Sequence, residues 1–161
     1  MKIEPVRGEI AGLRSFVSRY IDGVWWRHCY DPVSTTAPLR FIHSRLPLTL
    51  TPPNGFIHDF ASIPAIGWAV MGGPAGNGSD SMHGPAAILH DWAYEHQAWD
   101  QGAPLSRKGA DQLFAAALED LNVSEWRVRT MYRILRAFGG KHYRMHRDQK
   151  HHSDYTVGGD V

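Results

Sequence analysis

The sequence predicts an α+β fold in which an N-terminal antiparallel β region packs on a C-terminal core of three helices. Strand-type residues and turn dipeptides dominate residues 1–60, whereas apolar residues recur at helical spacing over residues 84–140. A chain of 161 residues with 43% hydrophobic content is long enough for one core but hardly for two. We therefore expect a single domain over residues 1–140. Residues 141–161 form a basic tail with few apolar residues, and we expect it to be partly disordered.

Composition excludes several classes of protein. The formal net charge of +1 gives no overall attraction to nucleic acid, and we expect no nucleic-acid partner. Cys29 is the only cysteine, which excludes a disulfide framework and a thiolate metal site. Charges and Pro5 interrupt the start of the chain, where a signal peptide would need an apolar run, and no segment approaches the roughly 20 apolar residues of a membrane span.

Turn residues divide the N-terminal half. Asp22-Gly23 lies between two runs of β-branched and aromatic residues and predicts a hairpin. Leu46, Leu48 and Leu50 alternate as in a strand, and Pro-Pro-Asn-Gly follows as a turn. Residues 61–71 fit either a short helix or a loop, and a glycine-rich loop follows them.

Three helices are predicted after that loop. Pro85 opens the first, which should end near Gly102 and Pro104. Ser106 is a suitable cap for the second. The third runs from Ser124 to Gly139-Gly140. Short turns between them favour antiparallel packing of neighbours.

The first of these helices carries titratable groups in an apolar setting. His90 and Tyr94 are four residues apart and share a face, whereas Asp91 points about 100° away. Asp111, in the first turns of the next helix, can meet His90, fix its tautomer and leave the other ring nitrogen free as a base. Asp91 can then bind a hard cation together with loop carbonyl oxygens. A catalytic His90 would face an open cleft, and a structural one would be sealed.

The segments "GGPAGN", "AAILHDWAY" and "GADQLF" together resemble the phospholipase A2 family, especially its disulfide-free form in parvovirus capsid proteins. The resemblance covers about residues 72–114. It implies that His90 activates a water, that Asp111 orients His90, and that Tyr94 supports them by a hydrogen bond. It also implies a calcium ion bound by Asp91 and the loop. The loop residues concerned are Gly72, Gly73, Gly76 and Asn77.

The whole chain, including "GFIHDFASIP", also resembles a phage and prophage family of unknown function. We therefore expect a calcium-dependent hydrolase that cleaves phospholipid acyl esters at a membrane surface. It would reside in the cytoplasm of the producing bacterium or in a virion, with virion proteins as further partners. Two alternatives stay open: a non-catalytic phage structural or interaction protein, and a metal-dependent cell-wall hydrolase.

Other polar residues can extend the site. Asp59 either caps a following helical turn or, with His58, reaches the cleft of His90 as a metal ligand or an orienting group. His58 and His83 keep zinc open as an alternative to calcium.

Two surface features are compatible with lipid. Trp92 and Trp99 are seven residues apart, so a continuous helix would place them on one face that could meet a lipid interface. The third helix carries a basic stripe that is either simply solvated or attractive to anionic lipid, and a basic C-terminus in a phage protein could also contact DNA or an acidic virion partner. The members of the stripe are Arg127, Arg129, Arg133 and Arg136, followed by Lys141, Arg144 and Arg147.

Overall fold

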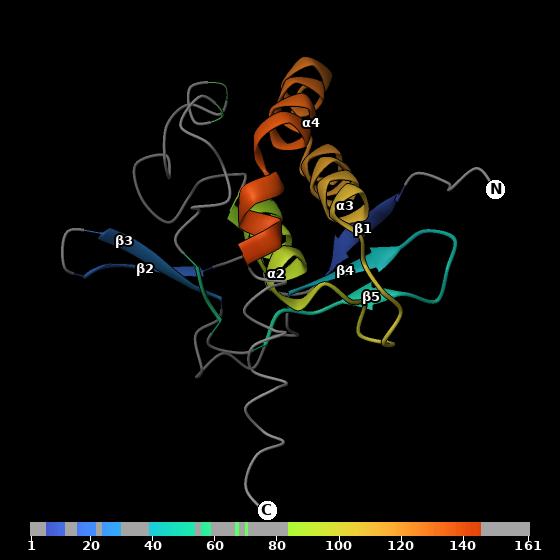
Figure 1. Ribbon diagram of the computed structural model, residues 1–161, viewed down its shortest axis with the longest axis horizontal. Helices are drawn as coiled ribbons and strands as arrows, with labels where there is room; N and C mark the ends of the chain where they lie inside the picture. Colours follow the sequence, from blue (N-terminus) through green and yellow to red (C-terminus); the bar gives the residue numbers. More distant parts are fainter. Residues whose placement is uncertain are drawn as a thin grey trace, which may run out of the picture.

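The computed structural model describes residues 6–11, 16–21, 24–29, 39–53, 56–58, 67, 70 and 84–145. It confirms the α+β class, with three helices packed together and small antiparallel sheets beside them (Figure 1). The helices are α2 (Gly84–His96), α3 (Arg107–Asp120) and α4 (Glu125–Phe138).

One sheet packs directly on the helices. It consists of β1 (Gly8–Ala11), β4 (Arg40–His43) and β5 (Thr49–Leu50), in the order β1-β4-β5. Ile10 pairs with Phe41, which pairs with Leu50, and all three side chains are buried. α3 lies against β1, and the Asp120 carboxylate at its end accepts the Ile10 N–H at 3.0 Å. This row of apolar pairs is therefore the face of the sheet that joins the core.

A second sheet confirms the predicted hairpin. It contains β2 (Phe16–Ile21), β3 (Val24–Cys29) and β6 (Ile57–His58). Ile21 pairs with Val24, so the connection spans two residues, Asp22 and Gly23, which themselves lie outside the described residues. In Figure 1 this ribbon and the β1-β4-β5 sheet lie on opposite sides of the helices.

The strand expected from Leu46 begins later than predicted. Residues 44–47 form a bend, Leu46 is exposed, and the strand starts at Thr49. The cause is a side-chain turn, because His43 Nδ1 accepts the N–H groups of Arg45 and Leu46 at 3.1 and 3.2 Å. Those two N–H groups are thus bonded within the bend.

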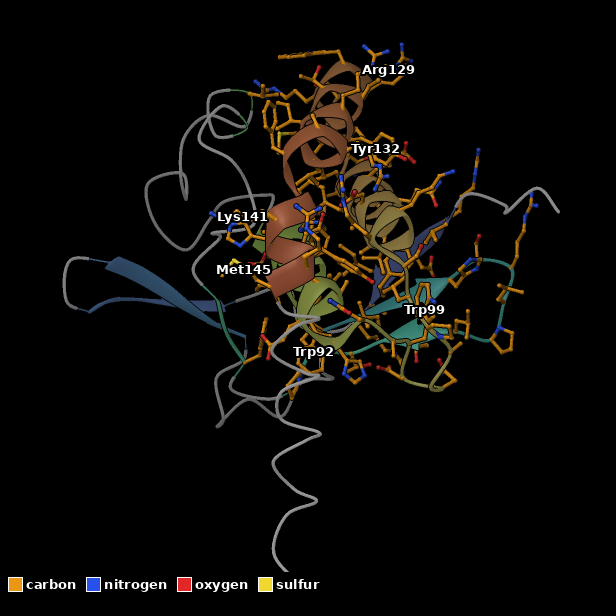
Figure 2. The ribbon with its side chains drawn as sticks, viewed as in Figure 1. Trp92, Trp99, Arg129, Tyr132, Lys141 and Met145 are labelled. Atoms are coloured by element: carbon orange, nitrogen blue, oxygen red, sulfur yellow. The ribbon has the colours of Figure 1, made fainter. Side chains whose placement is uncertain are left out.

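α2 ends at His96, several residues before the predicted glycine. Gln97 takes a left-handed φ of 57°, and its side-chain amide donates to the Tyr94 carbonyl at 3.0 Å. Trp99 consequently lies beyond the helix, buried against Phe41 with ring centroids 6.4 Å apart. The predicted shared face of Trp92 and Trp99 is therefore wrong, and Figure 2 shows the two rings well separated.

The other two helices begin where expected. The Ser106 hydroxyl accepts the Gly109 N–H at 3.1 Å and caps α3, as predicted. Ser124 precedes α4 and accepts the N–H groups of Arg127 and Val128 through its backbone carbonyl, whereas its side chain makes no cap bond.

The chain after α4 differs from the prediction that a partly disordered tail begins at residue 141. Helical backbone resumes after Gly139 and continues over residues 140–145. The Tyr143 hydroxyl donates to the Leu105 carbonyl at 3.0 Å, and the Tyr143 carbonyl accepts from Gln97 at 2.9 Å. These residues therefore belong to the packed domain.

α2 is the central helix of the core, since most of its residues are buried. The largest fully buried side chains of the described chain are Tyr94, Phe41, Phe114, Leu50, Ile88, Leu89, Leu113, Leu118, Met131, Leu135 and His90. Within the described ranges, no helix has the length and apolarity needed to cross a bilayer.

Replacing Gly8 with alanine should destabilise the β1-β4 pair more than a glycine replacement elsewhere. A Cβ at Gly8 would overlap the Ile42 carbonyl oxygen and the Phe41 ring, so β4 would have to move. We expect Gly8→Ala to lower the free energy of unfolding by about 1–3 kcal/mol in urea titrations. Gly102 is the control, because its φ is +84° but nothing lies within 4 Å, so Gly102→Ala should cost about 1 kcal/mol. Equal losses would contradict the steric explanation.

Candidate active site

Three helices bring their polar side chains to one buried carboxylate. We call this group the Asp111 cluster: His90 and Tyr94 from α2, Arg107 and Asp111 from α3, and Arg136 from α4. His90, Tyr94 and Asp111 are fully buried. The three residues predicted from sequence to form a catalytic unit are therefore in contact.

Both oxygens of Asp111 are bonded. Oδ1 accepts the Tyr94 hydroxyl at 2.5 Å and lies 3.2 Å from His90 Nε2. Oδ2 accepts Arg136 Nη1 at 2.8 Å, and Arg107 Nε lies 3.8 Å away. A buried carboxylate is costly unless it is paired and hydrogen-bonded. Here two arginines and two further donors compensate it.

These bonds decide the protonation states around Asp111. Burial acts to raise the pKa of Asp111, but the bonds from His90, Tyr94 and Arg136 outweigh it and hold this pKa below its usual value. Burial, together with the Asp111 charge, raises the pKa of Tyr94, so its hydroxyl stays protonated as a donor. An ionised carboxylate only accepts, so His90 must donate through Nε2. A neutral His90 then carries its lone pair on Nδ1.

The second ring nitrogen of His90 has a different environment. Nδ1 is buried, and no described residue provides it with a hydrogen-bond partner. Asp91 Oδ1 lies 4.0 Å from it. The two acidic residues thus take separate sides of the ring, as the helical geometry predicted. The ring itself is fully buried, however, so Nδ1 does not face the open cleft expected of a catalytic histidine.

Apolar packing holds the plane of the imidazole. The His90 ring lies 4.2 Å from the Tyr94 ring and 5.0 Å from the Phe114 ring, measured between centroids. A pocket of about 290 Å³ lies elsewhere, lined in part by Val6, Gln112 and Tyr132, and none of its lining residues belongs to the Asp111 cluster.

Arg107 positions α4 over the cluster. Its Nη2 donates to the carbonyls of Leu135, at 3.3 Å, and Arg136 in the last turn of α4. A cation at a helix C-terminus also meets the negative end of the helix dipole. Gly139 permits this close packing, since a Cβ there would lie 2.5 Å from the Tyr94 hydroxyl oxygen. α4 is thereby fixed with Arg136 against Asp111.

The two arginines were not predicted as site residues. Arg107 precedes Asp111 by four residues, a spacing that would have suggested an ion pair on α3. Arg136 was expected in the basic stripe with Arg129 and Arg133, but it turns inward to Asp111. No sequence signal distinguishes it from its neighbours, because the contact depends on how α4 crosses α3.

Several predicted site residues lie outside the described residues. They are the loop residues Gly72, Gly73, Gly76 and Asn77, and the accessory candidates Asp59 and His83. His58 is described as part of β6 through its backbone. Over the parts of the chain that the structure describes, no group of three or more His, Cys, Asp or Glu side chains could hold a metal.

Comparison with known families gives one match. A family model described as a protein of unknown function (DUF1353) matches residues 34–135, which is more than half of the chain. The matched region includes α2 and α3 and ends one residue before Arg136. Searches against curated proteins and against solved structures give no match.

Removing the Asp111 charge should destabilise the protein and change its response to acid. We expect Asp111→Asn to lower the free energy of unfolding by about 3–5 kcal/mol at neutral pH, because two arginines lose their partner. Since the pKa of folded Asp111 is lowered, its contribution is present above about pH 4 and lost as the pH falls through the folded value. The difference between wild type and variant, measured by urea titration, should therefore shrink in acid. A constant difference would contradict an ionised Asp111.

Arg136 should control the ionisation of Asp111. We expect Arg136→Gln to raise the pKa of Asp111, as measured by carbon-13 NMR of the carboxyl group, because a charge-assisted bond at 2.8 Å is lost. Arg107→Gln should raise it less, since Arg107 Nε lies 3.8 Å away. Arg133→Gln is the matched control on the exposed side of α4. If Arg136→Gln and Arg133→Gln titrate alike, Arg136 does not set the charge of Asp111.

Proposed function

The chain belongs to the DUF1353 family of unknown function, and we propose that it is a hydrolase of phospholipid acyl esters that uses His90 as its base and requires calcium. The main support is the arrangement of His90. Nε2 is bonded to the ionised Asp111, and Nδ1 has no hydrogen-bond partner in the described part of the chain and lies beside Asp91. The sequence resemblance to phospholipase A2 is consistent with these roles.

The lone pair on Nδ1 is energetically unusual. Buried polar groups are nearly always hydrogen-bonded, and leaving one without a partner costs about 1–3 kcal/mol. The same side chain forms its other bond to a fully buried carboxylate. A histidine with one fixed nitrogen and one free lone pair is suited to accept a proton.

The proposed reaction uses this pair directly. Water attacks the acyl carbonyl carbon while Nδ1 of His90 takes its proton. The ester C–O bond then breaks, and His90 returns the proton to the leaving oxygen, which releases a fatty acid and a lysophospholipid. Asp111 stabilises the imidazolium that forms in between, and Tyr94 and Arg136 hold Asp111 in place and ionised.

Asp91 fits the chemistry of a calcium ligand. It is a buried carboxylate on the Nδ1 side of His90, and carboxylate oxygens are preferred by this hard cation. Carbonyl oxygens from Gly73 and Gly76 and the side chain of Asn77 would complete the site. A bound calcium ion would stabilise the negative charge that develops on the acyl oxygen.

The full burial of His90 favours a second candidate function, a non-catalytic one. A sealed polar cluster can fix the packing of three helices, as a phage structural or interaction protein would need. In that case His90 serves only to hold Asp111. The two candidates differ in whether water and substrate reach Nδ1.

Removing the His90 side chain should abolish hydrolysis while the protein keeps its fold. We propose to assay phospholipid micelles and peptidoglycan with calcium, zinc or a chelator. Wild type should release fatty acid only with calcium, and His90→Ala should lower the rate about 10²–10⁴-fold. His96→Asn, on the same helix, is the matched control, and circular dichroism checks the fold. Asp91→Asn should weaken calcium binding in calorimetry.

Each other outcome would contradict part of the proposal. Full calcium-dependent activity of His90→Ala would exclude His90 as the base. Unchanged calcium affinity of Asp91→Asn would place the metal elsewhere, and zinc-dependent cleavage of peptidoglycan would indicate the cell-wall hydrolase. No cleavage of any substrate, together with very slow hydrogen exchange at the His90 ring carbon, would favour the structural candidate.

A further inference from the structure

The exposed side of α4 carries apolar and basic side chains that take no part in the proposed catalytic site. Of the described large hydrophobic side chains, those most exposed are Leu46, Trp126, Phe138 and Met145, with 53, 60, 59 and 46% of their surface accessible. Three of these four lie on α4 or the helical turn that follows it. We propose that this face of α4 docks on an anionic phospholipid surface.

The exposed apolar residues are spread along the helix. Trp126 lies in the first turn of α4 and Phe138 in the last, about 120° apart around the helix axis. Met145 adds a third exposed apolar side chain beyond Gly139. Figure 2 shows Arg129 near the start of α4, with Lys141 and Met145 on the turn beyond its end.

Positive charge accompanies these exposed apolar residues. Residues 125–145 contain six Arg or Lys residues and one acidic residue, Glu125, which pairs with Arg129. Arg136 is paired with Asp111, so its charge is already neutralised within the protein. Arg133, Lys141 and Arg144 are exposed. The surface is therefore cationic and apolar at once.

An anionic bilayer matches both properties. Basic amphipathic helices lie in the interface plane with aromatic and aliphatic side chains among the acyl chains. Each Lys or Arg near an anionic leaflet contributes about 1 kcal/mol. Nucleic acid would pair with the cations and could stack on Trp126, but its base planes offer no comparable environment for the exposed aliphatic side chain of Met145. The exposed Met145 thus favours lipid.

Vesicle sedimentation tests the docking. Wild type in chelator should bind vesicles of phosphatidylcholine mixed with phosphatidylglycerol and should not bind phosphatidylcholine alone. We expect the doubles Trp126→Ala/Phe138→Ala and Arg133→Gln/Lys141→Gln to bind at least about tenfold more weakly. Leu46→Ala and Arg40→Gln, which change an exposed apolar residue and an exposed cation on the β4-β5 side, are the matched controls and should bind like wild type.

Fluorescence identifies the residue that enters the lipid. Brominated acyl chains should quench part of the wild-type tryptophan emission, and Trp126→Phe should lose that part while it still sediments with anionic vesicles. Equal binding to neutral and anionic vesicles would overturn the proposal, as would equal losses in the control variants. Displacement of the protein from vesicles by duplex DNA at equimolar sites would indicate a nucleic-acid surface instead.

The docking and the hydrolase proposal can fail separately. Binding is measured without calcium and can be repeated with His90→Ala, so it does not require turnover. Conversely, a short-chain monomeric ester needs no surface, and Trp126→Ala/Phe138→Ala should hydrolyse it at the wild-type rate. Loss of vesicle binding with retained monomer hydrolysis supports docking through α4, whereas retained vesicle binding in this double variant overturns it.

Discussion

The buried charge of Asp111 is the constraint on which the arrangement of the helices depends. An isolated carboxylate inside a protein is so costly that it must be paired and fully hydrogen-bonded. No single helix supplies enough donors here. α2 provides Tyr94 and His90, α3 provides Arg107, and α4 provides Arg136. Each helix must therefore reach Asp111 in one orientation, which apolar packing alone would not specify.

The same constraint explains the helix ends. The Tyr94 hydroxyl that bonds Asp111 lies against the end of α4, where Gly139 leaves the space that a Cβ would fill. Gln97 ends α2 and bonds the carbonyls of Tyr94 and Tyr143, which holds the turn after α4 in place. Arg107 bonds the last carbonyls of α4 and lies beside Asp111. The ends of α2 and α4 are thus part of the polar cluster.

The sequence predicted what depends on local spacing. Helical periodicity placed His90 and Tyr94 on one face, and the cap at Ser106 fixed the start of α3, so Asp111 could be expected opposite them. The sequence did not predict the turns whose position is set by a side-chain hydrogen bond or by an unusual backbone angle. His43 Nδ1 makes the bend at Leu46, and the left-handed Gln97 separates Trp99 from α2. Neither turn carries a glycine or proline signal at the decisive position.

The sequence could not predict the role of Arg136, for a different reason. Arg129, Arg133 and Arg136 have the same chemistry, and only the crossing of α4 over α3 directs one of them inward. α4 therefore has two electrostatic roles: its inner side neutralises Asp111, and its outer side is left with unbalanced positive charge. The exposed Trp126 and Phe138 add apolar surface to that outer side.

Two buried nitrogens of the Asp111 cluster, His90 Nδ1 and Arg107 Nε, have no hydrogen-bond partner among the described residues. Asp111 has partners on both oxygens, and Tyr94 and Arg136 both donate to it. If the cluster served packing alone, Tyr94 and Arg136 would already hold the carboxylate, and the imidazole would add a buried nitrogen without a bond among the described residues. Local violations of this kind concentrate at functional sites. The unpartnered Nδ1 is therefore the observation on which the proposed proton transfer at His90 rests.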